Sequence, residues 1–279
     1  MTNSLLNASA LIVVGLASCL PLAAAETDWQ DNLGGRARAI AAGPIDPQTL
    51  SVDLAVQLEL KKGWKTYWRS PGDSGIPPDF DFSGSANLKD YEILWPAPKS
   101  FSDAYGSSIG YKDVVILPIR AVARSGALPL VVAVTMRYGV CERICVPVEN
   151  AFSLVVTRTS AETPALAALI EGAHGSVPAH GDPDAPLAVV GVARQGEAPN
   201  DHLLVTTRIA APNDHTELFI EGPKDWYFPL PKKVSETGGM VDWSVALAGL
   251  PDGAEISGKD FTFTLVSGKH AVEQNWHLD

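Results

Sequence analysis

Short runs in which apolar and polar residues alternate make up most of the chain, and Gly, Pro, Asn or Asp closes each run. This period of two predicts antiparallel strands, because successive side chains of a strand point to opposite faces of a sheet. Helical periodicity is nearly absent from the first half. The strands predicted there are Leu50–Leu60, Tyr91–Leu94, Val114–Ala123, Leu130–Tyr138 and Ala151–Thr157.

One stretch, Thr163–Glu171, has the pattern of a helix, since Thr163 is a candidate N-cap and Pro164 occupies the first turn before an apolar run. The segment after it, Gly172–Pro186, is rich in Gly, Pro, His and Asp and has few apolar residues, which is typical of a linker. We therefore place a domain boundary there. The predicted units are a first domain, a helix with its linker, and a second domain: residues 26–160, 161–185 and 186–279.

A second series of short strands follows the linker. The predicted strands are Leu187–Arg194, Leu203–Ala210, Glu217–Glu221, Trp226–Leu230, Val241–Leu247, Phe261–Val266 and Ala271–His277. About seven short strands in under a hundred residues is the count expected of an immunoglobulin-like sandwich. The predicted fold is all-β, with two immunoglobulin-like antiparallel β-sandwich domains joined by a short helix and linker.

The first 25 residues have the features of an export signal, because Leu5–Leu22 is almost uniformly apolar and leads to Ala25 through a run of alanines. Cleavage after Ala25 is the predicted outcome. A lipoprotein cleavage site ending at Cys19 is the alternative, and it would leave the protein tethered. Either route leads to the periplasm. Beyond Ala25 no apolar stretch approaches the roughly 20 residues that span a bilayer, so we expect no transmembrane segment in the mature chain.

The charge balance narrows the choice of partners. The chain of 279 residues has 32 acidic and 21 basic side chains, which gives a formal net charge of −11. Such a chain lacks the basic surface that neutralises phosphate backbones, so we expect no nucleic-acid partner.

Two of the three cysteines, Cys141 and Cys145, follow the predicted signal segment. In an extended strand, residues four apart lie about 13 Å from each other, which is too far for a disulfide. The chain must therefore turn between them, either through a three-residue hairpin loop that places the two cysteines opposite one another or through one helical turn.

A bridge of this kind closes only a short loop, so it constrains the unfolded chain weakly and stability is a poor reason for its presence. Tight and exposed disulfides exchange readily with thiolates, which favours a redox-active pair. The alternative is a bridge that merely pins a surface hairpin in an exported protein. None of the histidines stands at a spacing that would complete a zinc site with the two cysteines, and we expect neither a metal nor a cofactor.

Several motifs resemble the N-terminal periplasmic domain of the thiol:disulfide interchange protein DsbD. The segment Tyr105–Ile119, followed by the cysteine pair, carries the resemblance, and further segments are similar to the ScsB branch of that family: Gly63–Gly75, Trp95–Pro98 and Glu221–Phe228. The resemblance implies an immunoglobulin-like sandwich whose cysteines, Cys141 and Cys145 here, act in protein-disulfide reduction. It implies that one cysteine attacks a partner disulfide and the other resolves the mixed disulfide, with Cys145 as the attacking residue.

The resemblance also implies a cap loop over the disulfide at Asp103, Ala104 and Tyr105, and it places Tyr67 near the site. Ala104 stands where the family presents a phenylalanine. No membrane or thioredoxin-like domain follows in this chain, so we expect its electrons to come from a separate thioredoxin-like or membrane reductant. The partners implied are proteins bound by transient mixed disulfides. A non-catalytic binding or assembly module with a structural disulfide is the competing hypothesis.

Overall fold

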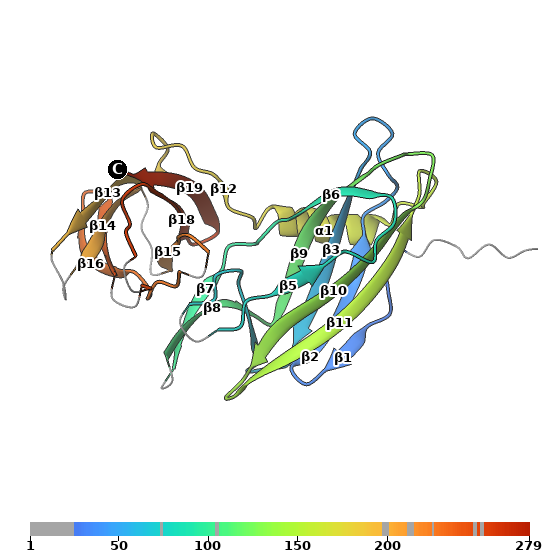
Figure 1. Cartoon of the computed structure of the whole chain (residues 1–279), viewed down its shortest axis with the longest axis horizontal. Coiled ribbons are helices and arrows are strands. Elements are labelled where there is room, and N and C mark those ends of the chain that lie inside the picture. Colours follow the sequence, from blue (N-terminus) through green and yellow to red (C-terminus); the bar gives the residue numbers. More distant parts are fainter. Residues whose placement is uncertain are drawn as a thin grey trace, which may run out of the picture.

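The computed structural model describes residues 25–279, except 73–74, 104–105, 197–200, 211–214, 225, 248–249 and 252–253. Most of the signal segment predicted at 1–25, together with Cys19, lies outside this part of the chain. The described residues form two lobes built from strands (Figure 1). The N-terminal lobe contains β1 to β11 and α1, and the C-terminal lobe contains β12 to β19. This arrangement confirms the predicted all-β, immunoglobulin-like fold.

The N-terminal lobe contains two sheets. The first has the order β1-β2-β3-β9-β6, with bounds Gln30–Asn32, Gly35–Ala41, Ser51–Leu60, Val114–Ala123 and Leu88–Ile93. The second has the order β11-β10-β4-β8-β7, with bounds Cys145–Val156, Leu130–Cys141, Lys65–Tyr67, Gly106–Lys112 and Lys99–Asp103. The short strand β5, Asp79–Asp81, also pairs with β10.

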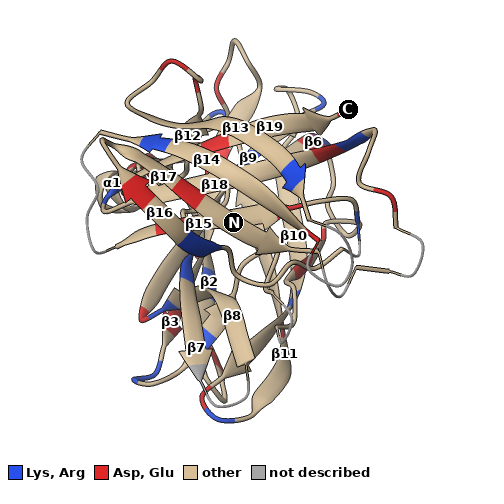
Figure 2. Ribbon diagram, turned by 90° about the vertical axis from the view of Figure 1, so that its left-hand side faces the viewer, with Lys and Arg blue, Asp and Glu red and all other residues tan. Residues whose placement is uncertain are grey.

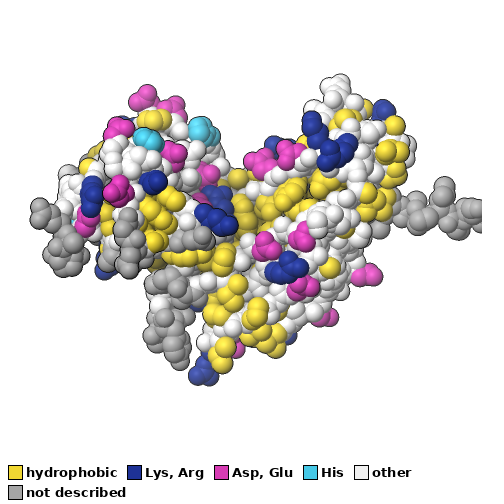
Figure 3. All heavy atoms as spheres, viewed as in Figure 1, with side chains coloured by type: hydrophobic (Ala, Val, Ile, Leu, Met, Phe, Trp, Pro, Cys, Tyr) yellow, Lys and Arg dark blue, Asp and Glu magenta, His cyan; other side chains and the backbone are white. Residues whose placement is uncertain are grey.

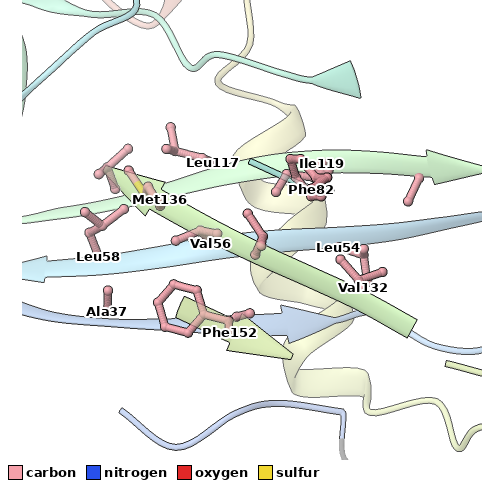
Figure 4. Close-up of a cluster of buried hydrophobic side chains, with 14 of the residues drawn as sticks. Ala37, Leu54, Val56, Leu58, Phe82, Leu117, Ile119, Val132, Met136 and Phe152 are labelled. Atoms are coloured by element: carbon pink, nitrogen blue, oxygen red, sulfur yellow. The ribbon is translucent and has the colours of Figure 1, made fainter. Parts of the chain in front are cut away.

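The two sheets of this lobe pack face to face around an apolar core (Figure 4). Every second residue of β10, from Leu130 to Val140, is buried in it, whereas Arg137 on the opposite face is exposed. This alternation is the period of two read from the sequence, with one face of the strand turned to the core. The remaining positions of β10, which include Cys141, therefore lie on the outer face of the sheet.

The C-terminal lobe also contains two sheets. One has the order β12-β19-β18-β15, with bounds Ala179–His180, His270–Leu278, Lys259–Ser267 and Thr216–Glu221. The other has the order β13-β14-β17-β16, with bounds Leu187–Gln195, His202–Ile209, Met240–Ala246 and Lys232–Thr237. Between them lies a second apolar cluster, to which strands of both sheets contribute. Lys and Arg are interspersed with Asp and Glu on the strands of both lobes (Figure 2).

The predicted helix is present as α1, Pro164–His174, and it extends three residues further than expected. Its apolar side is buried against the first sheet of the N-terminal lobe, where Leu166 and Ile170 cluster with Ile40 and Ala55. The helix thus belongs to the packing of that lobe and does not stand free between the lobes. Within the described residues, no helix has the length and hydropathy that crossing a bilayer requires.

The strand predicted at Trp226–Leu230 is wrong. The segment is irregular, and Pro229 with Pro231 explains why, since proline has no N–H to donate to a sheet ladder. Trp226 and Phe228 instead pack their rings against Phe261. The strand that forms instead is β16, which follows this segment. All six of its residues are exposed, so the sequence has no alternation of apolar and polar residues that would mark it as a strand.

Candidate functional site

The two cysteines face each other across the tip of the β10–β11 hairpin. The register of the hairpin runs from Leu130 opposite Val156 to Cys141 opposite Cys145, with three exposed residues in the loop between the cysteines. Both cysteines are free thiols, and their Sγ atoms lie 2.8 Å apart. The hairpin interpretation is therefore confirmed over the helical-turn alternative. A directly facing pair has the Cα spacing that a disulfide needs, so the sulfurs can bond without movement of the backbone.

The two thiols differ in their access to solvent. Cys141, the last residue of β10, is buried with 5 % of its surface exposed, whereas Cys145 is exposed. Ile144, beside Cys145 in the loop, is 77 % exposed, which is a large apolar side chain left uncovered at the tip. A second protein can therefore reach the sulfur of Cys145 before it can reach that of Cys141.

Strand β4 is the neighbour of β10 in the same sheet, and two of its side chains lie beside the cysteine pair. A turn that uses Gly63 in a left-handed conformation, with φ of 88°, reverses the chain after β3 and leads into β4. Lys65 then stands directly opposite Cys141 in the ladder. Facing residues of an antiparallel pair project from the same side of the sheet, so the buried Lys65 brings a positive charge to the side of the Cys141 thiol.

Tyr67, two residues further along β4, points to the same face and reaches the other sulfur. Its hydroxyl lies 2.7 Å from the Sγ atom of Cys145, within hydrogen-bond distance. The ring lies over Gly139, where a Cβ atom would stand only 2.8 Å from two ring carbons of Tyr67 and from the Cβ of Ile76. Only a glycine at this position of β10 leaves room for the ring, so the backbone itself is shaped to hold Tyr67 against the cysteines.

Burial raises the pKa of the Cys141 thiol above its usual value, and the neighbouring Cys145 raises it further. The hydrogen bond from Tyr67 and the charge of Lys65 act in the opposite direction and stabilise the thiolate. Burial also raises the pKa of the Tyr67 hydroxyl, with further contributions from both cysteines, so this hydroxyl stays protonated and can donate to a sulfur anion. The site therefore keeps Cys141 as a thiol at neutral pH and carries two groups that favour its ionisation when it reacts.

Of the residues predicted for the site, the structure brings together Cys141, Cys145 and Tyr67. Asp103 is the last residue of β7, and its backbone pairs with Gly106 across a hairpin. Ala104 and Tyr105, together with the side chain of Asp103, lie outside the described residues, so the cap interpretation stays a prediction.

Two charged residues differ in their relation to the cysteines. Lys65 was missed, although its place two residues before Tyr67 in a strand puts it on the same face. Arg137, four residues before Cys141, forms ion pairs with Glu149 and Asp79 further along the sheet. Among the residues that the structure describes, no group of three or more His, Cys, Asp or Glu side chains is placed to hold a metal ion.

Comparison with known proteins shows a similarity to a family model and to a solved structure. Residues 37–157 match the family model described as thiol:disulfide interchange protein DsbD, N-terminal. The fold of the chain is similar to the crystal structure of the N-terminal periplasmic domain of ScsB from Proteus mirabilis, with a TM-score of 0.72 and 21% sequence identity. That likeness covers 91% of this chain and 98% of the ScsB chain. No curated protein matches the chain.

Proposed function

We propose that the chain, whose residues 37–157 match the DsbD N-terminal domain family, is a periplasmic thiol–disulfide exchange protein whose redox pair is Cys141 and Cys145. The observation that carries the proposal is the pair of free thiols at an exposed hairpin tip, 2.8 Å apart and in contact with Tyr67. The periplasmic location is supported by the family and by the fold shared with a periplasmic domain.

The exchange proceeds in two steps. The thiolate of Cys145 attacks one sulfur of a partner disulfide, so that a mixed disulfide forms and the partner's second sulfur leaves as a thiolate. The thiolate of Cys141 then attacks the Sγ atom of Cys145, which closes the Cys141–Cys145 disulfide and releases the partner's first sulfur. Two electrons pass to the partner, which becomes a dithiol, and this protein becomes the disulfide.

The difference in exposure assigns the two roles. Cys145 is exposed and meets the partner, whereas Cys141 is buried and can attack only the sulfur that faces it. Because the ordinary value of a cysteine pKa is about 8.5 and burial raises that of Cys141, the resolving step needs help to ionise this thiol. The charge of Lys65 and the hydroxyl of Tyr67 provide it.

A purely structural role for the bridge is less well supported. A disulfide stabilises mainly by closing a loop in the unfolded chain, and a loop of three residues gives little of that effect. The exposed Ile144 next to Cys145 is also unexplained by a bridge that only pins a hairpin. Both features are expected where a partner protein must dock at the sulfur.

We extend the proposal to two further features of the chain. Its electrons come from a separate dithiol protein, thioredoxin-like or membrane-bound, which attacks the Cys141–Cys145 disulfide and becomes oxidised in turn. The boundary between the two sandwich domains lies in the segment at 161–185, after the last strand of the N-terminal lobe.

A trapping experiment with single cysteine variants tests the exchange. Reduced Cys141→Ser protein, mixed with oxidised glutathione and separately with an oxidised thioredoxin-like protein, is expected to accumulate a mixed disulfide at Cys145, because the resolving thiol is absent. The matched variant, Cys145→Ser, has only the buried thiol and is expected to accumulate far less. Wild-type protein is expected to release the reduced partner and to end as the internal disulfide. Equal trapping by both variants, or none by either, would overturn the proposed roles.

A further inference from the structure

The two lobes meet at strand β15, which contributes to both. Its residues alternate between two faces: Leu218 and Ile220 are buried in the core of the C-terminal lobe, whereas Phe219 belongs to the apolar cluster of the N-terminal lobe. The residues on either side of Phe219 on that face are Glu217 and Glu221, because side chains two apart on a strand share a face. Apolar side chains gather where the lobes come together (Figure 3).

Two of these three residues contact the residues that directly follow Tyr67, and the third contacts β7. The ring of Phe219 lies 5.9 Å from the ring of Trp68. Glu221 accepts two hydrogen bonds from the Nε of Arg69, at 2.8 and 3.1 Å, and one from its Nη2 at 2.6 Å. Glu217 accepts hydrogen bonds from the backbone N–H and the hydroxyl of Ser100 on β7.

Arg69 is the centre of this contact. Its guanidinium also bonds to Glu273 of the neighbouring strand β19, and it stacks over the ring of Trp68 at 4.8 Å. The side chains of Arg69 and Glu221 are 27% and 19% exposed, so water screens the pair only in part. Forked arginine–carboxylate bonds of this kind are stronger than neutral ones and fix orientation as well as distance.

The chain connects this contact to the cysteines within a few residues. Arg69 is two residues from Tyr67. Further along the chain, Gly75 leaves no space for a Cβ atom, which would stand 2.8 Å from a ring carbon of Tyr67, and Ile76 packs near Gly139. This part of the chain is thus bound to the acidic side chains of the C-terminal lobe at Arg69 and lies against the Tyr67 ring at Gly75.

We propose that the C-terminal lobe positions Tyr67 against the cysteine pair, with Arg69, Glu221 and Glu273 as positioning residues. Docking of the lobes holds Arg69, and through it Gly75 and Ile76, beside the Tyr67 ring, whose hydroxyl in turn contacts the cysteine pair. Loss of the ion pairs frees this segment and exposes the buried thiol. The inference stands on contacts outside the cysteine pair and does not depend on what the thiols react with.

The test measures access to Cys141 in the folded, reduced protein. In a Cys145→Ser background, Cys141 is the thiol that iodoacetamide alkylates after the signal segment is removed, and its rate at high pH reports how often the covering segment opens. The double variant Glu221→Gln with Glu273→Gln is expected to raise this rate roughly tenfold, because it weakens the charged hydrogen bonds that Arg69 makes with the two carboxylates. Amide hydrogen exchange of peptides covering 67–76 is expected to speed up in parallel.

A matched control uses an ion pair of the same lobe that is remote from the interface. Asp201→Asn breaks the exposed pair with Arg194 and is expected to leave both measurements unchanged. Arg69→Met is expected to have the same effect as the double glutamate variant, and combining all three changes is expected to add nothing, because they remove one shared contact.

An unchanged alkylation rate in a folded Glu221→Gln/Glu273→Gln protein would overturn the inference, and so would additive effects of the arginine and glutamate changes. If the double variant does not fold, Glu273→Gln alone, whose site is one third exposed, provides the same comparison with a smaller expected rise. These readouts report accessibility, so the inference can fail while thiol exchange persists, and exchange can fail while the inference holds.

Discussion

Replacing Lys65 by Met is expected to raise the pKa of the Cys141 thiol further, because the change removes a positive charge that favours the thiolate. The two residues face each other in the β4–β10 ladder, and both are buried. The Cβ atoms of facing residues lie about 5 Å apart, and unit charges at that separation interact by about 1 kcal/mol in water and by about 3 kcal/mol at an effective dielectric constant of 20. In the wild-type protein, burial and Cys145 together outweigh Lys65 and leave the pKa of Cys141 raised.

The assay is the pH profile of alkylation of Cys141 in the Cys145→Ser background. The midpoint is expected to move to higher pH in Lys65→Met, while the rate on the high-pH plateau stays the same because the thiol is equally covered. Lys65→Arg keeps the positive charge and is expected to retain the original midpoint. A midpoint that is unchanged or lower in Lys65→Met would refute the assignment of Lys65 as the group that favours the Cys141 thiolate.

The remaining predictions concern the surroundings of the pair. Tyr67→Phe is expected to destabilise the reduced protein by about 1 kcal/mol in urea denaturation and to change thiol reactivity, because it removes one hydrogen bond to sulfur. The control Tyr138→Phe, which loses hydrogen bonds to two asparagines, is expected to lower the stability by a similar amount and to leave thiol reactivity unchanged. Gly139→Ala is expected to destabilise the protein by about 1–3 kcal/mol by overpacking against the Tyr67 ring. Gly172→Ala on α1, where nothing lies within 4 Å of the added Cβ, is expected to stabilise it by about 0.4–1 kcal/mol. A Gly139→Ala protein that is as stable in thermal denaturation as the wild type, or more stable, would contradict this packing. The pKa of Cys141 is raised in the folded state. The stability that its protonated thiol contributes is therefore present below the unfolded pKa and is lost as pH rises above about 8.5. Reduced wild-type protein is expected to lose more stability than Cys141→Ala between pH 8 and 10, and equal losses would argue against a buried thiol.

Much of the fold could be predicted from the chain because its strands have one face in a core. Val114–Ala123 matches β9 at both ends, since turn residues bound this mostly apolar run. Chain geometry predicted a turn between Cys141 and Cys145 and left a hairpin loop and a helical turn as alternatives, between which the register of β10 and β11 decides. Strand β4 is three residues long and β16 is wholly exposed, so neither has an alternation that a sequence pattern can register.

The electrostatic part of the site was harder to predict for a different reason. Lys65 and Cys141 are far apart in sequence, and only the pairing of β4 with β10 shows that they are neighbours. The same holds for Arg69 and its two glutamates, which come from different lobes. Charged residues such as these resemble ordinary solvated side chains until the register and the docking of the lobes are known.

The reduction potential of the Cys141–Cys145 pair tests the central claim most directly. Purified wild-type protein is equilibrated with dithiol–disulfide buffers of defined potential, and the fraction of free thiol is measured by mass spectrometry after alkylation. A redox-active pair is expected to have a potential above about −300 mV, within reach of biological thiol reductants. A potential below that value would mark the bridge as one that resists reduction and would contradict thiol–disulfide exchange at this site.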